Sequence, residues 1–280
     1  MITISKIKEL QNLIRSCKEK GSVGFVPTMG ALHDGHLSLV KQSIKENTTT
    51  VVSIYVNPTQ FNDKNDLKRY PRDLDSDTKL LEPTGCDIIF APDTKEMYPE
   101  PDTRTFNFGA LETVMEGQHR PGHFNGVGQI VSKLFEAVMP DKAYFGLKDF
   151  QQLAVIRKLV ADNNYTIEIV PCPIARESDG LAMSSRNALL ETTKRNASPI
   201  IYKTLRETLA LSKTKNVAEI KETVRNIFSK EKDLVLEYFE IVDNKNLQPI
   251  AHFEANVPAT GCIAVHAGKV RLIDNIQYNS

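Results

Sequence analysis

The sequence carries no excess of charge of either sign and no long apolar run. Lysine plus arginine and aspartate plus glutamate number 35 each, so the formal net charge is zero. Without an overall positive field the chain has little to attract a polyanion, and we expect no nucleic-acid partner. No apolar run approaches the roughly 18 to 20 residues that a membrane-spanning helix needs, so we expect no membrane partner either.

The sequence also lacks the short motifs of several other protein classes. Its four cysteines are far apart and form no C-x-x-C pair, which argues against a zinc ribbon or a redox motif and favours buried thiols. Residues 1–21 have the pattern of an amphipathic helix, without the apolar core and cleavage site of a signal peptide. We therefore expect a cytoplasmic protein.

Short β-branched or apolar segments alternate with helical patterns along the first 176 residues. The segments that we expect to form strands are 22–28, 48–56, 86–92, 142–146 and 165–173. Between them, apolar residues recur three and four positions apart. This alternation predicts an α/β fold with a Rossmann-like parallel sheet and helices on both faces. The segment 104–117 is expected to be an insertion with a short strand of its own.

The pattern changes after residue 176. Two helical segments, near 190–212 and 216–231, precede three short apolar segments that we expect to form an antiparallel sheet. The sequence therefore predicts two domains, 1–176 and 177–280, and the second is a small α+β unit.

Two of only six histidines, His33 and His36, follow the first expected strand. In an open parallel sheet, ligands bind beyond the carboxyl ends of the strands, where helix N-termini present free N–H groups. An imidazole there can donate to a phosphate oxygen and neutralise the charge that develops as pyrophosphate leaves. Gly35 between them has no side chain and lets a base or ribose approach. The alternative interpretation is a pair of histidines that cap and pack a helix.

A second polar motif, MSSRN at 183–187, lies in the loop after the last expected strand of the first domain. Two hydroxyls and the guanidinium of Arg186 can bind a triphosphate. The same residues are also typical of an ordinary helix N-cap. Together with HDGH on an α/β chain, this motif resembles the signature pair of the HIGH-type nucleotidyltransferase superfamily.

Seven ordered segments narrow the resemblance. They are VPTMGALHDGH, VNPTQF, YPRDL, RPGHFNGV, FGLKDFQQL, DGLAMSSRN and RLIDN. In this order they resemble the pantoate-beta-alanine ligase family along the whole chain. Seven segments in order are a far more specific signal than any single motif.

The resemblance implies an enzyme that uses ATP and Mg²⁺ to adenylate pantoate and releases pyrophosphate. The amine of β-alanine then attacks the pantoyl adenylate to give pantothenate and AMP. A carboxylate is a poor acyl donor, so the mixed anhydride with AMP supplies the leaving group and must be shielded from water. The resemblance also implies that 1–176 binds nucleotide and pantoate, that 177–280 acts as a lid with a hinge near Gly180, and that the protein is a homodimer.

The resemblance assigns roles residue by residue. The expected catalytic residues are His33, His36, Lys148 and Arg186. The expected ATP-binding residues are Met29, Gly30, Ala31, Leu32, His33, Asp34, Gly35, His36, Gly146, Leu147, Lys148, Asp149, Ala175, Met183, Ser184, Ser185 and Arg186. The residues expected to bind pantoate or β-alanine are Asn57, Gln60, Arg120, His123 and Gln152.

Several of these residues also have plainer interpretations. Lysines such as Lys148 are most often surface residues, and Asp149 can cap the next helix as well as hold ribose hydroxyls. An R-P-G turn with a satisfied histidine explains much of the pattern at Arg120 and His123. For Lys148 we expect the role implied by the resemblance, a point charge on the reacting phosphate.

For Mg²⁺ the sequence offers the acidic residues Asp73, Asp75 and Asp77, of which Asp75 or Asp77 is the candidate ligand. A solvated helix face explains these aspartates equally well. Magnesium commonly needs only one or two carboxylates beside substrate phosphates.

This chain departs from the family pattern at two positions. The family usually has Glu or Gln where this chain has Leu147. Related tRNA synthetases carry a lysine where this chain has Met183. Lys148 and Arg186 must therefore supply more of the positive charge that binds phosphate.

Two alternative functions stay open at this point. One is another HIGH-type nucleotidyltransferase that acts on a phosphorylated substrate such as phosphopantetheine, against which RPGHF and GLKDFQQL argue. The other is a nucleotide-binding regulatory module without catalysis, which the intact phosphate-handling residues disfavour.

Overall fold

The computed structural model describes residues 1–278, and the chain divides into two units. Unit 1 consists of Met1–Phe108, Arg120–Leu147 and Gln152–Pro173. Unit 2 consists of Gly109–His119, Lys148–Gln151 and the chain from Ile174 onward. Residues 109–119, 148–151 and 174–176 thus belong to unit 2, whereas the predicted domains, 1–176 and 177–280, are continuous stretches.

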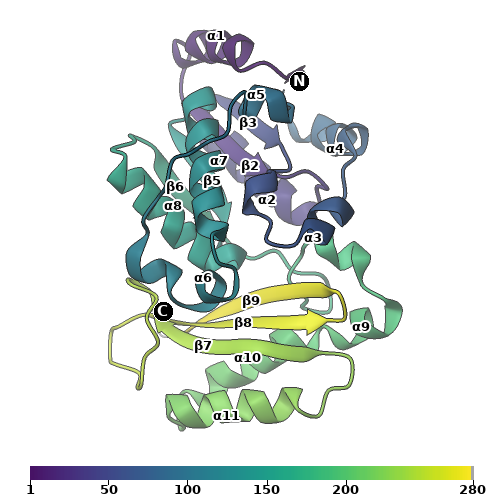
Figure 1. Ribbon diagram of the computed structural model, residues 1–280, viewed down its shortest axis with the longest axis vertical. Helices are drawn as coiled ribbons and strands as arrows, with labels where there is room; N and C mark the ends of the chain where they lie inside the picture. The colour runs from purple at the N-terminus through teal and green to yellow at the C-terminus, as the bar shows by residue number, and fades with distance from the viewer. Residues whose placement is uncertain (279–280) are drawn as a thin grey trace. The chain divides into compact units, whose positions relative to one another are not determined.

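Strands and helices alternate along unit 1 (Figure 1), and the symbol η denotes a short 3₁₀ helix. The elements are β1 (Ile2–Ile4), α1 (Ile7–Lys18), β2 (Val23–Thr28), α2 (Asp34–Glu46), β3 (Thr49–Ile54), η1 (Pro58–Gln60), α3 (Lys64–Arg69), α4 (Leu74–Leu81), η2 (Glu82–Thr84), β4 (Ile88–Phe90), α5 (Thr94–Met97), α7 (His123–Val138), β5 (Lys142–Gly146) and β6 (Glu168–Cys172). The elements η4 (Leu147–Asp149) and α8 (Phe150–Asp162) include residues of both units.

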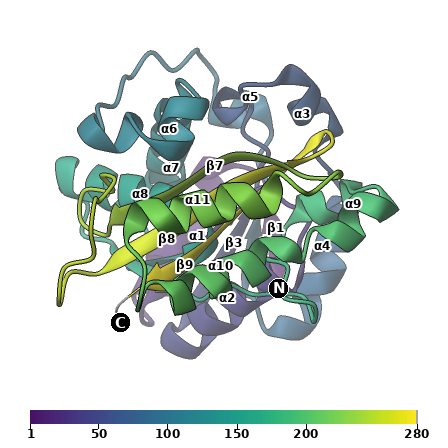
Figure 2. The same ribbon diagram turned by 90° about the horizontal axis from the view of Figure 1, so that it is seen from below.

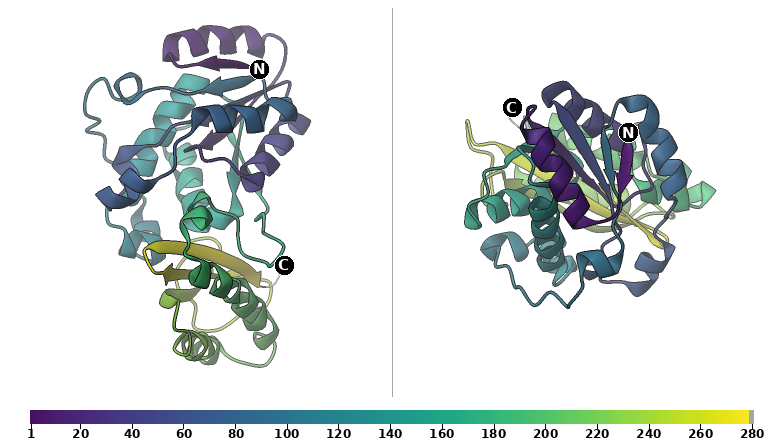
Figure 3. Two further views of the ribbon diagram at one scale, coloured as in Figure 1. Left: turned by 90° about the vertical axis from the view of Figure 1, so that its right-hand side faces the viewer. Right: turned by 90° about the horizontal axis from the view of Figure 1, so that it is seen from above.

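The sheet of unit 1 has six parallel strands in the order β1-β4-β3-β2-β5-β6. Right-handed crossovers put α2 and α4 on one face and α1, α7 and α8 on the other. The contacts agree, because α2 packs against β2, β3 and β5, whereas α1 packs against α7. Helices therefore cover both sides of the sheet, which confirms the predicted α/β architecture (Figure 3).

The central strands are apolar because both of their faces are covered. Phe25, Val26, Val51 and Val52 are fully buried, as expected for strands between two helical layers. The end of β2 lies in the middle of the sheet, where the order of strands changes direction. A crevice beyond this end is the usual ligand site of such a sheet.

Two features of unit 1 differ from the sequence prediction. Residues 1–21 were expected to be helical, but β1 precedes α1 and pairs with β4, because Ile2–Ile4 are β-branched and extend the sheet edge. The expected strand within 104–117 is absent from the described structure. There, the Phe106 N–H donates to Asn125 Oδ1 at 2.8 Å instead of to a neighbouring strand.

Unit 2 combines a small sheet with helices, as predicted. Its elements are η3 (Gly109–Glu112), α6 (Met115–His119), η5 (Ser185–Leu189), α9 (Thr192–Ala197), α10 (Ile200–Leu211), α11 (Val217–Phe228), β7 (Val235–Asp243), β8 (Ala259–Ala267) and β9 (Val270–Tyr278). The three strands are antiparallel in the order β7-β8-β9. The helices α10 and α11 pack together and against this sheet (Figure 2).

The helical segment expected at 190–212 is two helices. It breaks between α9 and α10 at Ser198 and Pro199, because proline has no N–H to continue the hydrogen-bond ladder. Among the described residues, no helix is both long and apolar enough to span a membrane. Three cysteines are buried and Cys17 is partly exposed.

Candidate active site

The loop between β2 and α2 positions the two histidines at a helix N-terminus. Gly30 and Ala31 adopt positive φ angles of 78° and 50°, which turn the chain from the strand toward the helix. His33 is the N-cap of α2, and its Nδ1 accepts the Gly35 N–H at 3.1 Å. Since Nδ1 accepts, Nε2 carries the proton in the neutral ring and can donate to an anion. The rings of His33 and His36 lie 4.1 Å apart between centroids.

Asp77 on α4 holds this loop through both carboxylate oxygens. Its Oδ2 accepts the Ala31 N–H at 3.0 Å, and its Oδ1 accepts the Leu32 N–H at 2.7 Å. Burial raises the pKa of Asp77, and the two backbone hydrogen bonds oppose that rise. A Cβ on Gly30 would lie 2.8 Å from Oδ2, so glycine allows the carboxylate its close approach. The geometry gives Asp77 a clear structural role at the base of the histidine loop.

The burial and hydrogen bonds of Asp77 and Asp75 distinguish the two candidate magnesium ligands. Asp77 is 2% exposed with both oxygens engaged by backbone, which does not fit a metal ligand. Asp75 is exposed in the first turn of α4. Within residues 1–278, no three His, Cys, Asp or Glu side chains gather in a group that could hold a metal ion. Of the two candidates, Asp75 is the one whose side chain is exposed.

A second cluster in unit 1 surrounds Gln60 at the end of η1. The Gln60 carbonyl accepts from His123 Nδ1 at 2.8 Å and from an Arg120 guanidinium nitrogen at 3.4 Å. The Gln60 side chain accepts from Asn57 Nδ2 at 3.2 Å and directs its Nε2 to Met29 Sδ at 3.2 Å. These contacts bring together four of the residues expected at the pantoate or β-alanine site and join them to the histidine loop through Met29.

Gly126 allows η1 to lie against α7. A Cβ at this position would be 2.4 Å from the Thr59 carbonyl oxygen and 2.9 Å from Gln60 Cα. Both neighbours are backbone atoms, so neither can rotate away. The Gly126 carbonyl also accepts from Asn57 Nδ2 at 3.2 Å. Gly126 thus sets the position of Gln60, a role that the sequence analysis missed.

In unit 2, the β9 residues Asp274 and Asn275 hold the chain around Lys148. Asn275 Nδ2 donates to the Lys148 carbonyl at 3.0 Å, and Lys148 Nζ lies 3.6 Å from Asp149 Oδ1. Asp274 accepts two hydrogen bonds from Arg176, at 2.6 and 3.0 Å. Burial raises the pKa of Asp274, while the charges of Arg176 and Lys148 act in the opposite direction.

The MSSRN motif leads into a 3₁₀ helix, η5, rather than an α-helix. Ser184 is its N-cap and accepts the Arg186 N–H at 3.3 Å, so the capping role and a phosphate-binding role can coexist in one motif. The Met183 N–H donates to the Ala175 carbonyl at 2.9 Å, which ties the motif to the preceding strand-like segment. Ser185 and Arg186 follow in η5.

The remaining expected residues lie at element ends. Gly146 ends β5, Leu147 begins η4, Gln152 lies in α8, and Asp34 and Gly35 open α2. The structure thus places the expected residues in two groups: those from Met29 to Leu147 together with Gln152 in unit 1, and Lys148, Asp149, Ala175 and 183–186 in unit 2.

Known proteins similar to this chain agree with the resemblance of its motifs. A family model described as pantoate-beta-alanine ligase matches residues 2–277. The pantothenate synthetase of Bacteroides thetaiotaomicron is 55% identical over 279 residues, which are 99% of both chains. The pantothenate synthetase of Bacteroides fragilis is 56% identical over 279 residues, which are again 99% of both chains.

Solved structures are similar along the whole chain. The crystal structure of pantothenate synthetase from Thermus thermophilus matches with a TM-score of 0.93 and 41% identity over 100% of both chains. The pantoate-beta-alanine ligase from Francisella tularensis, complexed with beta-gamma ATP and beta-alanine, matches with a TM-score of 0.83 and 35% identity. That match covers 99% of this chain and 97% of the other.

Proposed function

The chain belongs to the pantoate-beta-alanine ligase family, and from that premise we propose how its own residues carry out the family's ATP-dependent ligation. The observation that carries the proposal is the loop after β2, where His33 and His36 stand at a helix N-terminus next to the Gln60 cluster. In this arrangement the proposed nucleotide site is next to the proposed pantoate site.

We propose that the histidine loop binds ATP. Met29 to His36 line the nucleotide, and the N-terminus of α2 supplies N–H groups and a positive dipole end. His33 donates through Nε2 to a phosphate oxygen, because its Nδ1 is engaged by Gly35. His36 neutralises charge on the departing pyrophosphate.

We propose that pantoate binds at Gln60, with Gln152 on the same substrate. A carboxamide both donates to and accepts from a hydroxyl, which suits a substrate with two hydroxyls and a carboxylate. The Gln60 side chain is held by Asn57 and Met29, so its orientation is set before substrate arrives. Preorganisation of this kind lowers the entropy that binding must otherwise overcome.

We propose that His123 serves the incoming amine. Its Nδ1 contacts a carbonyl oxygen, which can only accept, so Nδ1 carries the ring proton and Nε2 is the basic nitrogen. A basic imidazole nitrogen can accept a proton from the ammonium group of β-alanine. Arg120, beside the same carbonyl, contributes positive charge for a carboxylate.

For unit 2, we propose that Lys148, Asp149 and residues 183–186 bind ATP. Lys148 supplies a point charge to the reacting phosphate, and Asp149 accepts from the ribose hydroxyls. Ser184, Ser185 and Arg186 bind the β- and γ-phosphates, for which a guanidinium offers paired donors. The hydrogen bond from Asn275 to the Lys148 carbonyl fixes the backbone from which that lysine projects.

In the proposed sequence of steps, a carboxylate oxygen of pantoate attacks the α-phosphorus of ATP, and the bond to pyrophosphate breaks. The amine of β-alanine then attacks the pantoyl carbonyl carbon, the amide bond forms, and AMP leaves. A Mg²⁺ ion, for which Asp75 is the candidate carboxylate ligand, would supply positive charge near the ATP phosphates. We also propose a homodimer in the cytoplasm and a lid role for 177–280.

The exchange of labelled pyrophosphate into ATP tests the first half-reaction. We expect exchange that depends on pantoate and needs no β-alanine, because the adenylate forms before the amine reacts. Exchange that depends instead on a phosphorylated acceptor such as phosphopantetheine would contradict the proposal and support a different nucleotidyltransferase. No exchange with either acceptor would point to a nucleotide-binding module without catalysis.

A further inference from the structure

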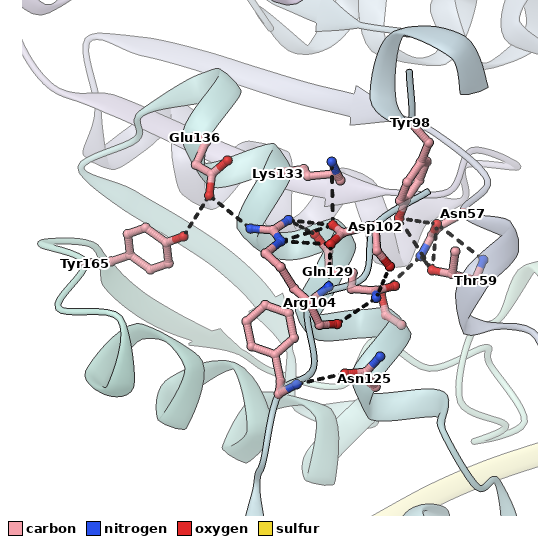
Figure 4. A network of polar contacts seen from close by, with 12 residues as sticks. Asn57, Thr59, Tyr98, Asp102, Arg104, Asn125, Gln129, Lys133, Glu136 and Tyr165 are labelled. Carbon is pink, nitrogen blue, oxygen red and sulfur yellow. Dashed lines mark hydrogen bonds and ion pairs between the residues drawn. The ribbon is translucent and has the colours of Figure 1, made fainter. Parts of the chain in front are cut away.

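Asn57, next to Gln60, receives a hydrogen bond from a tyrosine that no step above uses. The hydroxyl of Tyr98, which directly follows α5, donates to Asn57 Oδ1 at 2.9 Å and lies 3.4 Å from Thr59 Oγ1 (Figure 4). Asn57 is only 1% exposed. The same oxygen also accepts from the Thr59 hydroxyl at 3.2 Å, and Asn57 Nδ2 donates to the Gly126 carbonyl at 3.2 Å. The hydrogen bond from Tyr98 is the shortest of the contacts that hold the Asn57 side chain in one orientation.

The Tyr98 ring is itself held firmly. Lys133 Nζ lies 5.1 Å from the ring centroid and also 3.5 Å from Asp102 Oδ2. Asp102 in turn forms an ion pair with Arg104 at 2.7 Å (Figure 4). Burial raises the pKa of Tyr98 to about 12, so its hydroxyl stays protonated and donating at neutral pH.

A chain of two hydrogen bonds connects Tyr98 to Gln60 through the Asn57 side chain. With Oδ1 accepting from Tyr98 and Nδ2 donating to the Gly126 carbonyl, the Asn57 side chain directs its Nδ2 to Gln60 Oε1. Gln60 must then present Oε1 to Asn57 and Nε2 to Met29. A reversed Asn57 would place oxygen against oxygen at Gln60, and Gln60 would have to reverse as well.

We propose that Tyr98 is a positioning residue for pantoate, which acts through Asn57 to fix the donor and acceptor directions of the Gln60 carboxamide. This inference rests on the proposed role of Gln60 in binding pantoate. Without the Tyr98 hydroxyl, the Asn57 side chain loses its shortest hydrogen bond, and the Gln60 carboxamide is held less firmly in the orientation that suits the hydroxyls of the substrate.

The variant Tyr98→Phe removes the hydroxyl and keeps the ring. We expect the KM for pantoate to rise roughly 2- to 10-fold, as the loss of one neutral hydrogen bond implies. The KM for ATP and the thermal unfolding midpoint should change little. Tyr165→Phe is the matched control, because that hydroxyl contacts Glu136 at 3.3 Å and is in the same network, without a contact to Asn57. It should leave the KM for pantoate unchanged.

A double-variant cycle with Gln60→Ala separates the inference from its premise. If Tyr98 acts through Gln60, the double variant should have the same KM for pantoate as Gln60→Ala alone. Should Gln60→Ala raise that KM while Tyr98→Phe does not, the inference fails and the proposed function stands. Should Gln60→Ala leave it unchanged, the proposed role of Gln60 and the inference both fail. Equal losses of pantoate and ATP affinity in Tyr98→Phe would show a general structural role and overturn the inference.

Discussion

At the scale of single residues, one buried carboxylate sets the shape of the histidine loop. Asp77 accepts backbone hydrogen bonds from Ala31 and Leu32, the residues that precede His33. Ala31 has a positive φ, which an alanine rarely adopts unless its neighbours hold it there. The two hydrogen bonds supply that hold on the backbone directly before His33.

The variant Asp77→Asn should weaken catalysis more than pantoate binding. Asparagine has one oxygen and one NH₂ group, so its NH₂ group would face the N–H of Ala31 or Leu32 at a buried position. This clash of two donors should lower the free energy of unfolding by about 1–3 kcal/mol. We expect kcat to fall by roughly 10- to 100-fold as the histidines shift, with the KM for pantoate little changed. Steady-state kinetics of pantothenate formation measure both values.

Asp73→Asn is the control for that change. Asp73 is the exposed N-cap of the same helix and accepts the Ser76 N–H at 3.0 Å, a role that asparagine fills equally well. If the two variants behave alike, Asp77 does not hold the loop in the way described.

How far the sequence predicts the site differs from residue to residue. His33 and His36 could be placed at a helix start, because the motif follows an apolar strand directly. Asp77 could be seen only as a candidate magnesium ligand, since it lies 45 positions beyond Leu32 and no local pattern joins them. Tyr98 and Gly126 carried no signal of their own for the same reason.

At the scale of elements, the contact between η1 and α7 places Gln60. The first turn of α7 contributes His123, and its next residues bring the Gly126 carbonyl to Asn57. The close approach of two backbones is possible only because Gly126 has no side chain. The position of this substrate-binding residue therefore depends on how a helix and a loop pack.

The variant Gly126→Ala should displace η1 and weaken pantoate binding. The new Cβ would lie 2.4 Å from the Thr59 carbonyl oxygen, and overpacking of this kind costs about 1–3 kcal/mol. We expect the KM for pantoate to rise roughly 5- to 100-fold, measured at saturating ATP.

Gly128→Ala provides the comparison on the same helix. Its Cβ would lie 2.9 Å from side-chain atoms of Phe106, so it disturbs packing away from η1. It should lower the thermal unfolding midpoint while the KM for pantoate stays near its original value. A rise in that KM equal to the one in Gly126→Ala would contradict the placement of Gln60 by η1.

The sequence predicted most elements because their hydrophobic periods are clear, and it failed where a partner strand decides the outcome. The strands of both sheets other than β1 were recognised as apolar or β-branched segments. β1 was missed because a three-residue strand has no period and exists only beside β4. The strand expected in 104–117 does not form, because no neighbouring strand pairs with this segment. Its phenylalanines pack beside α7 instead.

At the scale of the whole molecule, unit 2 is assembled from distant parts of the chain. Glu116 accepts two hydrogen bonds from Arg271, each at 2.7 Å, and a third from the Tyr238 hydroxyl at 2.7 Å. Glu116 and Arg271 are 155 positions apart, so no local pattern indicated that 109–119 joins the C-terminal sheet. The resemblance of seven ordered segments predicted the family, whereas composition alone indicated only which kinds of partner not to expect.

The central claim is that Lys148 stabilises the charge that develops as pantoate is adenylated, while Gln60 binds pantoate itself. The most direct test is the steady-state kinetics of Lys148→Ala and Gln60→Ala in one assay of pyrophosphate release. We predict that Lys148→Ala lowers kcat by roughly two to three orders of magnitude with pantoate affinity little changed. Gln60→Ala should raise the KM for pantoate more than the KM for ATP. Near-normal turnover in Lys148→Ala, or a larger effect of Gln60→Ala on ATP than on pantoate, would contradict the account.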